Sequence, residues 1–250
     1  MTQPTTSSLA AAVHDATAQA RTALDALAPG DFAAPSSLPG WSTAQLLAHL
    51  DGVSRALARQ LAYAARGERI GFYDGGVDGR NERIELGALQ QPAALAAQVR
   101  QGLDLLDEAI NDVPADGWDA ATSFRGEGTV TDCVKAAWRE VLIHATDVGT
   151  TVTVADWPAE FSAHLFDFLS LRVPSGVRLL LQPTGRQPVV LGVEEPGEGA
   201  TGYVVTGMEF DLAAWLAGRE PSGPVRATAS ADGVDLPELL SWPSGLATAP

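Results

Sequence analysis

The sequence predicts a two-domain α+β protein, with an antiparallel four-helix bundle in residues 1–153 and a smaller α+β domain in residues 154–250. Two observations predict this division. Four segments before Gly149 repeat apolar residues every three or four positions, which is the pattern of helices that bury one face. After Gly149 the chain contains short apolar runs separated by glycine and proline, which is typical of strands joined by turns.

The first two predicted helices have clear boundary signals. The first covers about residues 8–27 and stops before a Pro-Gly pair. The second begins with a capping box, in which the side chains of Ser42 and Gln45 each satisfy a backbone N–H. Its apolar stripe then continues to about Arg66.

Two further helices complete the predicted bundle. The third opens with Pro92, whose missing N–H costs nothing in the first turn, and runs to about Ile110. The fourth follows Thr131 or Asp132 as its N-cap and ends at Gly149.

The linker over residues 67–91 is too long for a simple turn between bundle helices. Its centre, residues 71–76, has the sequence GFYDGG and is unsuited to regular helix. We therefore expect the linker to fold over one end of the bundle, with a short helix over residues 79–86.

The second domain is predicted to mix helices and strands. The helices cover residues 156–171 and 209–217, and the strands cover residues 177–181, 188–193 and 202–205. Residues 247–250 are predicted to be disordered.

Charge and hydropathy exclude several classes of partner. The 250 residues include 16 lysines and arginines against 31 aspartates and glutamates, so the formal net charge is −15. Polyanions are held by clustered basic side chains, so this balance excludes a nucleic-acid binder and disfavours an anionic membrane surface. We expect a cytoplasmic protein, because the sequence contains neither a leader-like segment nor a membrane-spanning apolar run of about 18 residues.

Three side chains could supply a metal site. Glu140 and His144 are four residues apart on the fourth predicted helix, so both project from one face, and His49 lies at the edge of the second helix's apolar stripe. Two imidazoles and a carboxylate are the ligands of a catalytic zinc with one open position. Asp147, one turn beyond His144, would fix that ring's tautomer. A plainer interpretation also fits, with a solvated Glu140–His144 pair and a hydrogen-bonded structural His49.

Cys133 is the only cysteine of the chain. An intrachain disulfide is therefore excluded, and any thiol chemistry must use this residue or a thiol from outside. Cys133 lies two turns before Glu140, and we interpret it as a small buried hydrophobe rather than a nucleophile.

Three segments of the chain resemble one known family. Residues 38–50 (LPGWSTAQLLAHL) and 138–149 (WREVLIHATDVG) resemble the two metal motifs of the DinB-like, mycothiol-dependent maleylpyruvate isomerase family. Residues 79–85 (GRNERIE) are similar to a segment that follows the second helix in that family. The resemblance spans most of residues 38–150, with the motifs in the same order and at similar separations.

The resemblance implies a DinB-type bundle, zinc held by His49, Glu140 and His144, and the thiol cofactor mycothiol. The zinc would make a thiolate accessible at neutral pH. Addition of that thiolate to a cis double bond conjugated to a carbonyl, rotation and release would turn maleylpyruvate into fumarylpyruvate. The expected partners are thus a small-molecule substrate and a low-molecular-weight thiol, with the protein a monomer or homodimer.

The resemblance also implies functional roles for three other polar residues. Arg219 matches a catalytic arginine that follows a helix in the family's C-terminal domain, where a guanidinium can bind an enolate or a carboxylate. Arg80 and Asn81 match residues of the cleft and are the candidates for binding the cofactor.

Alternative functions remain open at this stage. The same zinc thiolate would serve a mycothiol S-transferase acting on another electrophile, and a DinB-like bundle can also be a non-catalytic binding protein. A zinc hydrolase would need a general base, and the metal motif offers no spare glutamate beside its histidines. Nickel or iron would accept the same ligands as zinc.

Overall fold

The computed structural model describes residues 5–193, 201–229 and 232–243. The chain forms two compact units, and it passes from the first to the second between Val152 and Thr153. A helical bundle followed by a smaller α+β part confirms the predicted fold class. None of the described helices is both long and apolar enough to cross a membrane.

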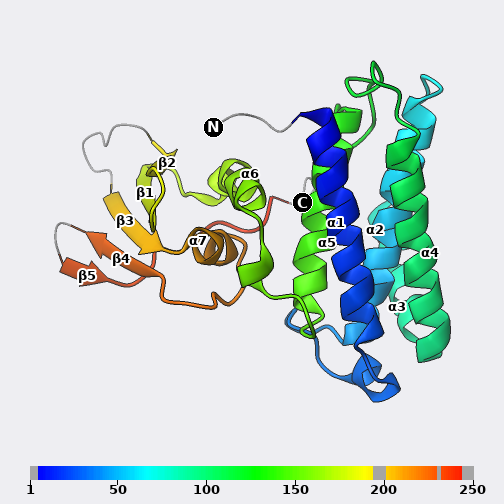
Figure 1. Ribbon diagram of the computed structural model, residues 1–250, viewed down its shortest axis with the longest axis horizontal. Helices are drawn as coiled ribbons and strands as arrows, with labels where there is room; N and C mark the ends of the chain where they lie inside the picture. Colours follow the sequence, from blue (N-terminus) through cyan, green and yellow to red (C-terminus); the bar gives the residue numbers. More distant parts are fainter. Residues whose placement is uncertain (1–4, 194–200, 230–231, 244–250) are drawn as a thin grey trace. The chain divides into compact units, whose positions relative to one another are not determined.

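In the residues that the structure describes, the N-terminal unit is built from five α-helices (Figure 1). Four of them coincide with the predicted bundle helices within a few residues, and their apolar faces form the core, where leucines such as Leu46 and Leu106 are fully buried. The helices are α1 (Thr6–Asp25), α2 (Thr43–Ala64), α3 (Gly76–Ala88), α4 (Pro92–Asn111) and α5 (Val130–Asp147), with a short 3-10 turn η1 (Pro29–Ala33) between α1 and α2.

Helices α2 and α4 run in the same direction. Asp51 accepts a hydrogen bond from Gln98, and one turn later Arg55 donates to Gln101, so the two helices advance together. This direction follows from α3, which carries the chain back along the bundle before α4 begins (Figure 1). The bundle therefore contains both parallel and antiparallel neighbours, so the helical bundle is confirmed but its predicted antiparallel arrangement is wrong for α2 and α4.

The linker between α2 and α4 differs from its prediction. Its helix is longer than the predicted residues 79–86, and it packs along α2 instead of folding over the end of the bundle. The close approach requires a glycine, because a Cβ on Gly87 would lie 2.7 Å from the Cβ of Ala48. Only Ile84 and Gly87 of α3 are buried, which is why its weak apolar periodicity gave little warning of this packing.

Capping boxes begin both helices that carry the candidate metal ligands. The predicted box of Ser42 and Gln45 is confirmed at the start of α2. The predicted N-cap of α5, Thr131 or Asp132, is wrong by two or three residues. Thr129 is the N-cap, since its hydroxyl accepts the N–H of Asp132 and the Asp132 carboxylate accepts the N–H of Thr129.

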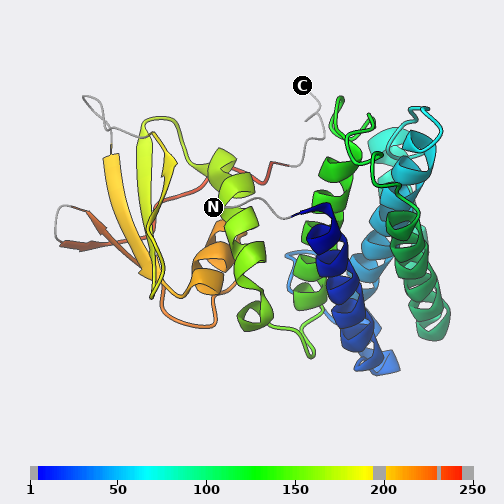
Figure 2. The ribbon, with the colours of Figure 1, turned by 45° about the horizontal axis from the view of Figure 1, so that its top comes forward.

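Within its described ranges, 153–193, 201–229 and 232–243, the C-terminal unit contains a five-stranded sheet in the order β2-β1-β3-β4-β5. β1 and β3 are parallel and the other neighbours are antiparallel. Figure 2 shows α6 and α7 on one face of this sheet, where Leu179 and Leu181 of β1 are fully buried. The elements are α6 (Ala159–Leu169), β1 (Val177–Pro183), β2 (Val189–Gly192), β3 (Thr201–Gly207), α7 (Glu209–Leu216), β4 (Arg226–Ala229) and β5 (Asp232–Val234).

The sequence predicted the first three strands and both helices of this unit but not β4 and β5. The segments RATA and DGV are short and contain alanine, glycine and aspartate, which favour strands poorly. They become strands by pairing with β3 and with each other. The prediction for residues 247–250 lies outside the described residues.

Candidate metal centre

Helix α5 supplies two of the candidate donor atoms. Glu140 and His144 lie one turn apart, and the Glu140 Oε2 is 3.4 Å from the His144 Nε2. The His144 side chain is 11% exposed and that of Glu140 is 30% exposed, so the carboxylate is the more accessible of the two. The predicted common face of these residues is therefore present.

Helix α2 brings His49 to the same point from across the bundle. The Nε2 of His49 lies 3.3 Å from the same carboxylate oxygen of Glu140. The rings of His49 and His144 meet edge to face, with their centroids 4.9 Å apart. The three donor atoms all lie within 4.8 Å of one another, and we call these residues the triad.

The spacing of the triad fits a small divalent cation. Zinc binds imidazole nitrogen and carboxylate oxygen at about 2.0–2.1 Å, so tetrahedral ligands stand about 3.3–3.4 Å apart. The two separations from Glu140 Oε2, 3.3 Å to His49 and 3.4 Å to His144, agree with this value. Two nitrogens and one oxygen also form a common zinc ligand set, which leaves a fourth position for an exchangeable ligand.

Asp147 orients the His144 ring, as the helical spacing predicted. Its Oδ2 lies 2.8 Å from the His144 Nδ1, and its carboxylate is almost completely buried. A carboxylate only accepts hydrogen bonds, so Nδ1 carries a proton and the lone pair of a neutral ring lies on Nε2. The Nε2 of His144, which faces Glu140, is therefore the nitrogen available to a metal.

Charge and burial perturb all three triad residues. Burial alone would lower the pKa of His144, but the hydrogen bonds to Asp147 and Glu140 raise it to about 9. Burial would raise the pKa of Glu140, yet its bonds to His144 and His49 hold it well below its usual value. Burial lowers the pKa of His49 against the opposing bond to Glu140. Without a metal, the triad is a neutral His49 beside a His144–Glu140 ion pair.

Arg80 reaches the triad from α3, and Asn81 stands one step farther out. The Arg80 Nη2 is 3.4 Å from the His49 Nδ1, and its Nη1 donates to the Asn81 Oδ1 at 2.9 Å. The guanidinium also lies 5.9 Å from the centroid of the Trp41 ring. Asn81 is exposed on the surface of α3. It is linked to the triad through its hydrogen bond with Arg80.

Arg219 lies in the C-terminal unit, directly after α7. Its Nη1 donates to the Ala217 carbonyl at 2.8 Å, and its backbone N–H caps the Ala214 carbonyl. The guanidinium lies 5.8 Å from the centroid of the Trp242 ring. These contacts place the cation at the C-terminal end of α7, where the helix dipole stabilises positive charge. Arg219 therefore belongs to the C-terminal unit, whereas the triad belongs to the N-terminal unit.

The sequence interpretation missed two side chains beside the triad. Tyr73 lies in the glycine-rich centre of the linker, where burial and the charge of Glu140 raise its pKa to about 12. Trp41 lies directly before the N-cap of α2, and its ring meets His49 edge to face at 5.7 Å between centroids. The signal for Tyr73 was an aromatic pair, Phe72 and Tyr73, inside a segment otherwise suited to a turn.

Arg139 is a third missed residue, and it is almost completely buried next to Glu140 on α5. Burial lowers its pKa to about 10, although the nearby Glu140 opposes this shift. An arginine within an amphipathic helix gave no sequence signal of burial, because long cationic side chains usually reach solvent.

Cys133 is fully buried, as expected for a small hydrophobe. Its Sγ donates a weak hydrogen bond to the Thr122 Oγ1 at 3.5 Å. Burial raises the pKa of the thiol to about 11, so the nucleophilic thiolate is scarce at neutral pH.

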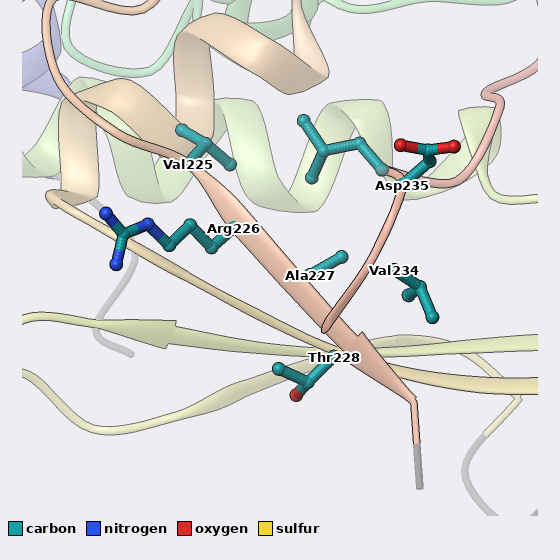
Figure 3. Close-up of a pocket in the computed structure, with 7 residues that line it drawn as sticks. Val225, Arg226, Ala227, Thr228, Val234 and Asp235 are labelled. Carbon is teal, nitrogen blue, oxygen red and sulfur yellow. The ribbon is translucent and has the colours of Figure 1, made fainter. Parts of the chain in front are cut away.

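A separate cavity of about 820 Å³ lies in the C-terminal unit at β4 and β5 (Figure 3). Its charged side chains, Arg226 and Asp235, point away from each other in Figure 3. The lining residues are Val225, Arg226, Ala227, Thr228, Val234, Asp235 and Leu236. None of them belongs to the predicted site, so the triad and this cavity are distinct features.

Two family models and two solved structures match the chain. Residues 13–149 match the Mycothiol maleylpyruvate isomerase N-terminal domain, and residues 156–240 match the MDMPI C-terminal domain. The crystal structure of the mycothiol-dependent maleylpyruvate isomerase has 25% sequence identity and a TM-score of 0.83, with 97% of this chain and 100% of that chain covered. A histidine-to-alanine mutant of that enzyme matches over the same shares, with 24% identity and a TM-score of 0.83. A comparison with curated proteins gave no match.

Proposed function

Because the chain belongs to the mycothiol maleylpyruvate isomerase family, we propose that it is a zinc- and mycothiol-dependent cis-trans isomerase that converts maleylpyruvate to fumarylpyruvate. The observation that carries this proposal is the convergence of one donor atom each from His49, Glu140 and His144 within 4.8 Å. Such a set fits one divalent cation with a position left for a sulfur ligand.

The bound groups would supply a thiolate at neutral pH and, with it, a nucleophile for reversible addition to a conjugated double bond. The triad would hold the cation, and Asp147 keeps the proton of His144 on Nδ1, which leaves the lone pair of Nε2 for a metal. The two imidazole rings are nearly buried, which limits water at the site from their side. Glu140, the more exposed ligand, lies at the accessible edge.

The anionic substrate requires positive or donating groups, and two of them lie beside the triad. The guanidinium of Arg80 contacts His49, and Tyr73 remains a neutral phenol at pH 7 because its pKa is about 12. Either group can donate hydrogen bonds to a carboxylate. We assign Arg80 and Asn81 to binding of the thiol cofactor, as the family resemblance implies, and Tyr73 to the edge of the same site.

Arg219 is our candidate for binding the carboxylate or the developing enolate oxygen of the substrate. This assignment rests on the family resemblance and on its guanidinium, which binds carboxylates in a fork. The net charge of −15 opposes the approach of an anion at long range. Salt screens that field beyond about 8 Å, so local arginines determine binding inside the site.

Metal analysis combined with a thiol-dependence assay tests the proposal. The purified protein should contain one zinc per chain and isomerise maleylpyruvate only when mycothiol is added. His144→Ala should remove zinc and activity together. His14→Ala is the matched control, because His14 lies in the same bundle but pairs with Asp107 of α4, and it should retain both.

Other outcomes would contradict the proposal in identifiable ways. Full activity in a zinc-free His144→Ala variant would exclude the metal centre. Activity without added thiol would direct attention to Cys133. A stable sulfur adduct in place of the trans isomer would identify a mycothiol S-transferase, and a protein with neither metal nor activity would be a binding protein.

A further inference from the structure

The two histidines of the triad have opposite neighbours on their outer nitrogens. The Nδ1 of His144 faces the carboxylate of Asp147 at 2.8 Å, whereas the Nδ1 of His49 faces the Nη2 of Arg80 at 3.4 Å. A carboxylate can only accept a hydrogen bond from a ring N–H, and a guanidinium can only donate one. The Nδ1 of His144 therefore faces a hydrogen-bond acceptor, whereas the Nδ1 of His49 faces a hydrogen-bond donor.

The Arg80 contact determines which nitrogen of His49 carries the proton. A neutral imidazole has one N–H and one lone pair, so an Nδ1 that accepts from Arg80 leaves the proton on Nε2. That Nε2 lies 3.3 Å from the Glu140 carboxylate, which accepts the proton's hydrogen bond. A protonated imidazolium has no lone pair that could accept a hydrogen bond from Arg80, so this contact requires the neutral ring. Both hydrogen bonds thus select the same tautomer of His49.

We propose that Arg80 holds His49 in the tautomer that cannot ligate a metal, so that the Arg80–His49 hydrogen bond and metal binding at the triad exclude each other. This inference rests on the proposed function, because it concerns the same triad. Metal binding needs the lone pair on Nε2, so the ring proton must move to Nδ1 while the ring stays neutral. The new Nδ1–H then faces an N–H of Arg80, and two donors cannot share a hydrogen bond.

Other contacts of Arg80 keep it close when that bond breaks. Its Nη1 donates to Asn81 on its own helix, and its guanidinium lies over the Trp41 ring, 5.9 Å from the ring centroid. Its charge also acts on Tyr73. Arg80 is therefore a positioning residue that links metal loading to the availability of a guanidinium beside the site. It would become free to bind an anionic group only in the metal-loaded protein.

The zinc affinity of Arg80→Met tests the coupling. Methionine keeps an unbranched apolar stem and the helix propensity of α3, but it lacks the guanidinium and donates no hydrogen bond. We expect zinc to bind about tenfold more tightly, the size of effect that neighbours of metal-binding histidines commonly exert. Arg83→Met is the matched control, because Arg83 lies one turn farther along α3, is exposed, and carries the same charge. Its zinc affinity, measured by competition with a chelator, should stay within about twofold of wild type.

The tautomer of His49 is read directly from the nitrogen chemical shifts of ¹⁵N-histidine-labelled protein. We expect Nε2–H in the metal-free wild type and Nδ1–H after zinc is added. An Nδ1–H ring in the metal-free wild type would overturn the inference, as would an Arg80→Met variant that binds zinc no more tightly. Equal tightening in Arg80→Met and Arg83→Met would reduce the effect to charge and would also overturn it. If the wild type binds no zinc, the proposed function fails, whereas the metal-free tautomer still tests the Arg80 contact.

Discussion

Asp147→Asn should weaken zinc binding because it disturbs the tautomer of His144. The native carboxylate is 1% exposed and lies 2.8 Å from the His144 Nδ1, so it makes a buried hydrogen bond to a charged group. Asparagine has nearly the same shape but carries an NH₂ group that can donate to Nδ1. The ring proton would then be displaced onto Nε2, where the metal must bind.

The magnitude follows from the change in that hydrogen bond. A bond to a charged group contributes about 1.5–3 kcal/mol and a neutral one about 0.5–1.5 kcal/mol, so the exchange costs about 1–1.5 kcal/mol. That difference corresponds to about a tenfold loss of affinity, and loss of the preferred tautomer extends the range to about 100-fold. Competition with a chelator at fixed pH measures the zinc affinity, and a denaturant titration measures the free energy of unfolding.

Asp51→Asn is the matched control for this experiment. Asp51 is equally buried in the same bundle, but its carboxylate accepts hydrogen bonds from Arg55 and Gln98. Asp51→Asn should reduce the free energy of unfolding while its zinc affinity stays within about twofold of wild type. An Asp147→Asn variant that binds zinc as tightly as the wild type would refute the role assigned to Asp147.

Three further predictions concern separate parts of the chain. Arg219→Ala should lower turnover by about 100-fold, because it removes a group that stabilises developing charge, while the zinc content stays near normal. Loss of zinc in this variant would instead show that Arg219 has a structural role. Cys133 should resist alkylation in the folded protein at pH 8. Because the pKa of its thiol is about 11, the thiolate fraction should rise about tenfold per pH unit below that value. Rapid labelling at pH 8 would contradict its burial. Gly102→Ala would place a Cβ 2.6 Å from the Asp51 Oδ1 and should cost about 1–3 kcal/mol of unfolding free energy, so an unchanged denaturation midpoint would contradict this packing.

The bundle was predictable because its signals are local. The capping box of Ser42 and Gln45, the proline that opens α4 and the repeated apolar residues each act within one or two turns of helix. The same locality explains the failures. Strands β4 and β5 have little preference of their own and form by pairing with residues distant in the chain. The path of α3 along α2 depends on the fit of Gly87 against Ala48, which no periodicity reports.

The candidate site was predictable in part for the same reason. The shared face of Glu140, His144 and Asp147 follows from positions on one helix, and the structure places the three side chains as that spacing requires. The approach of His49 depends on how α2 packs against α5, so the sequence offered only its position at the edge of an apolar stripe. Tyr73 was missed because it lies in an irregular segment. Such a segment has no sequence periodicity from which the direction of a side chain could be predicted.

The shallow attachment of α3 has a consequence for how this protein can diverge. Only Ile84 and Gly87 of the helix are buried, so most of its positions can change at little cost to folding. The ligands themselves lie on α2 and α5, whose many buried side chains restrict substitution. Related chains can therefore remodel the edge of the site, which Arg80 occupies here, while they inherit the same framework for the triad.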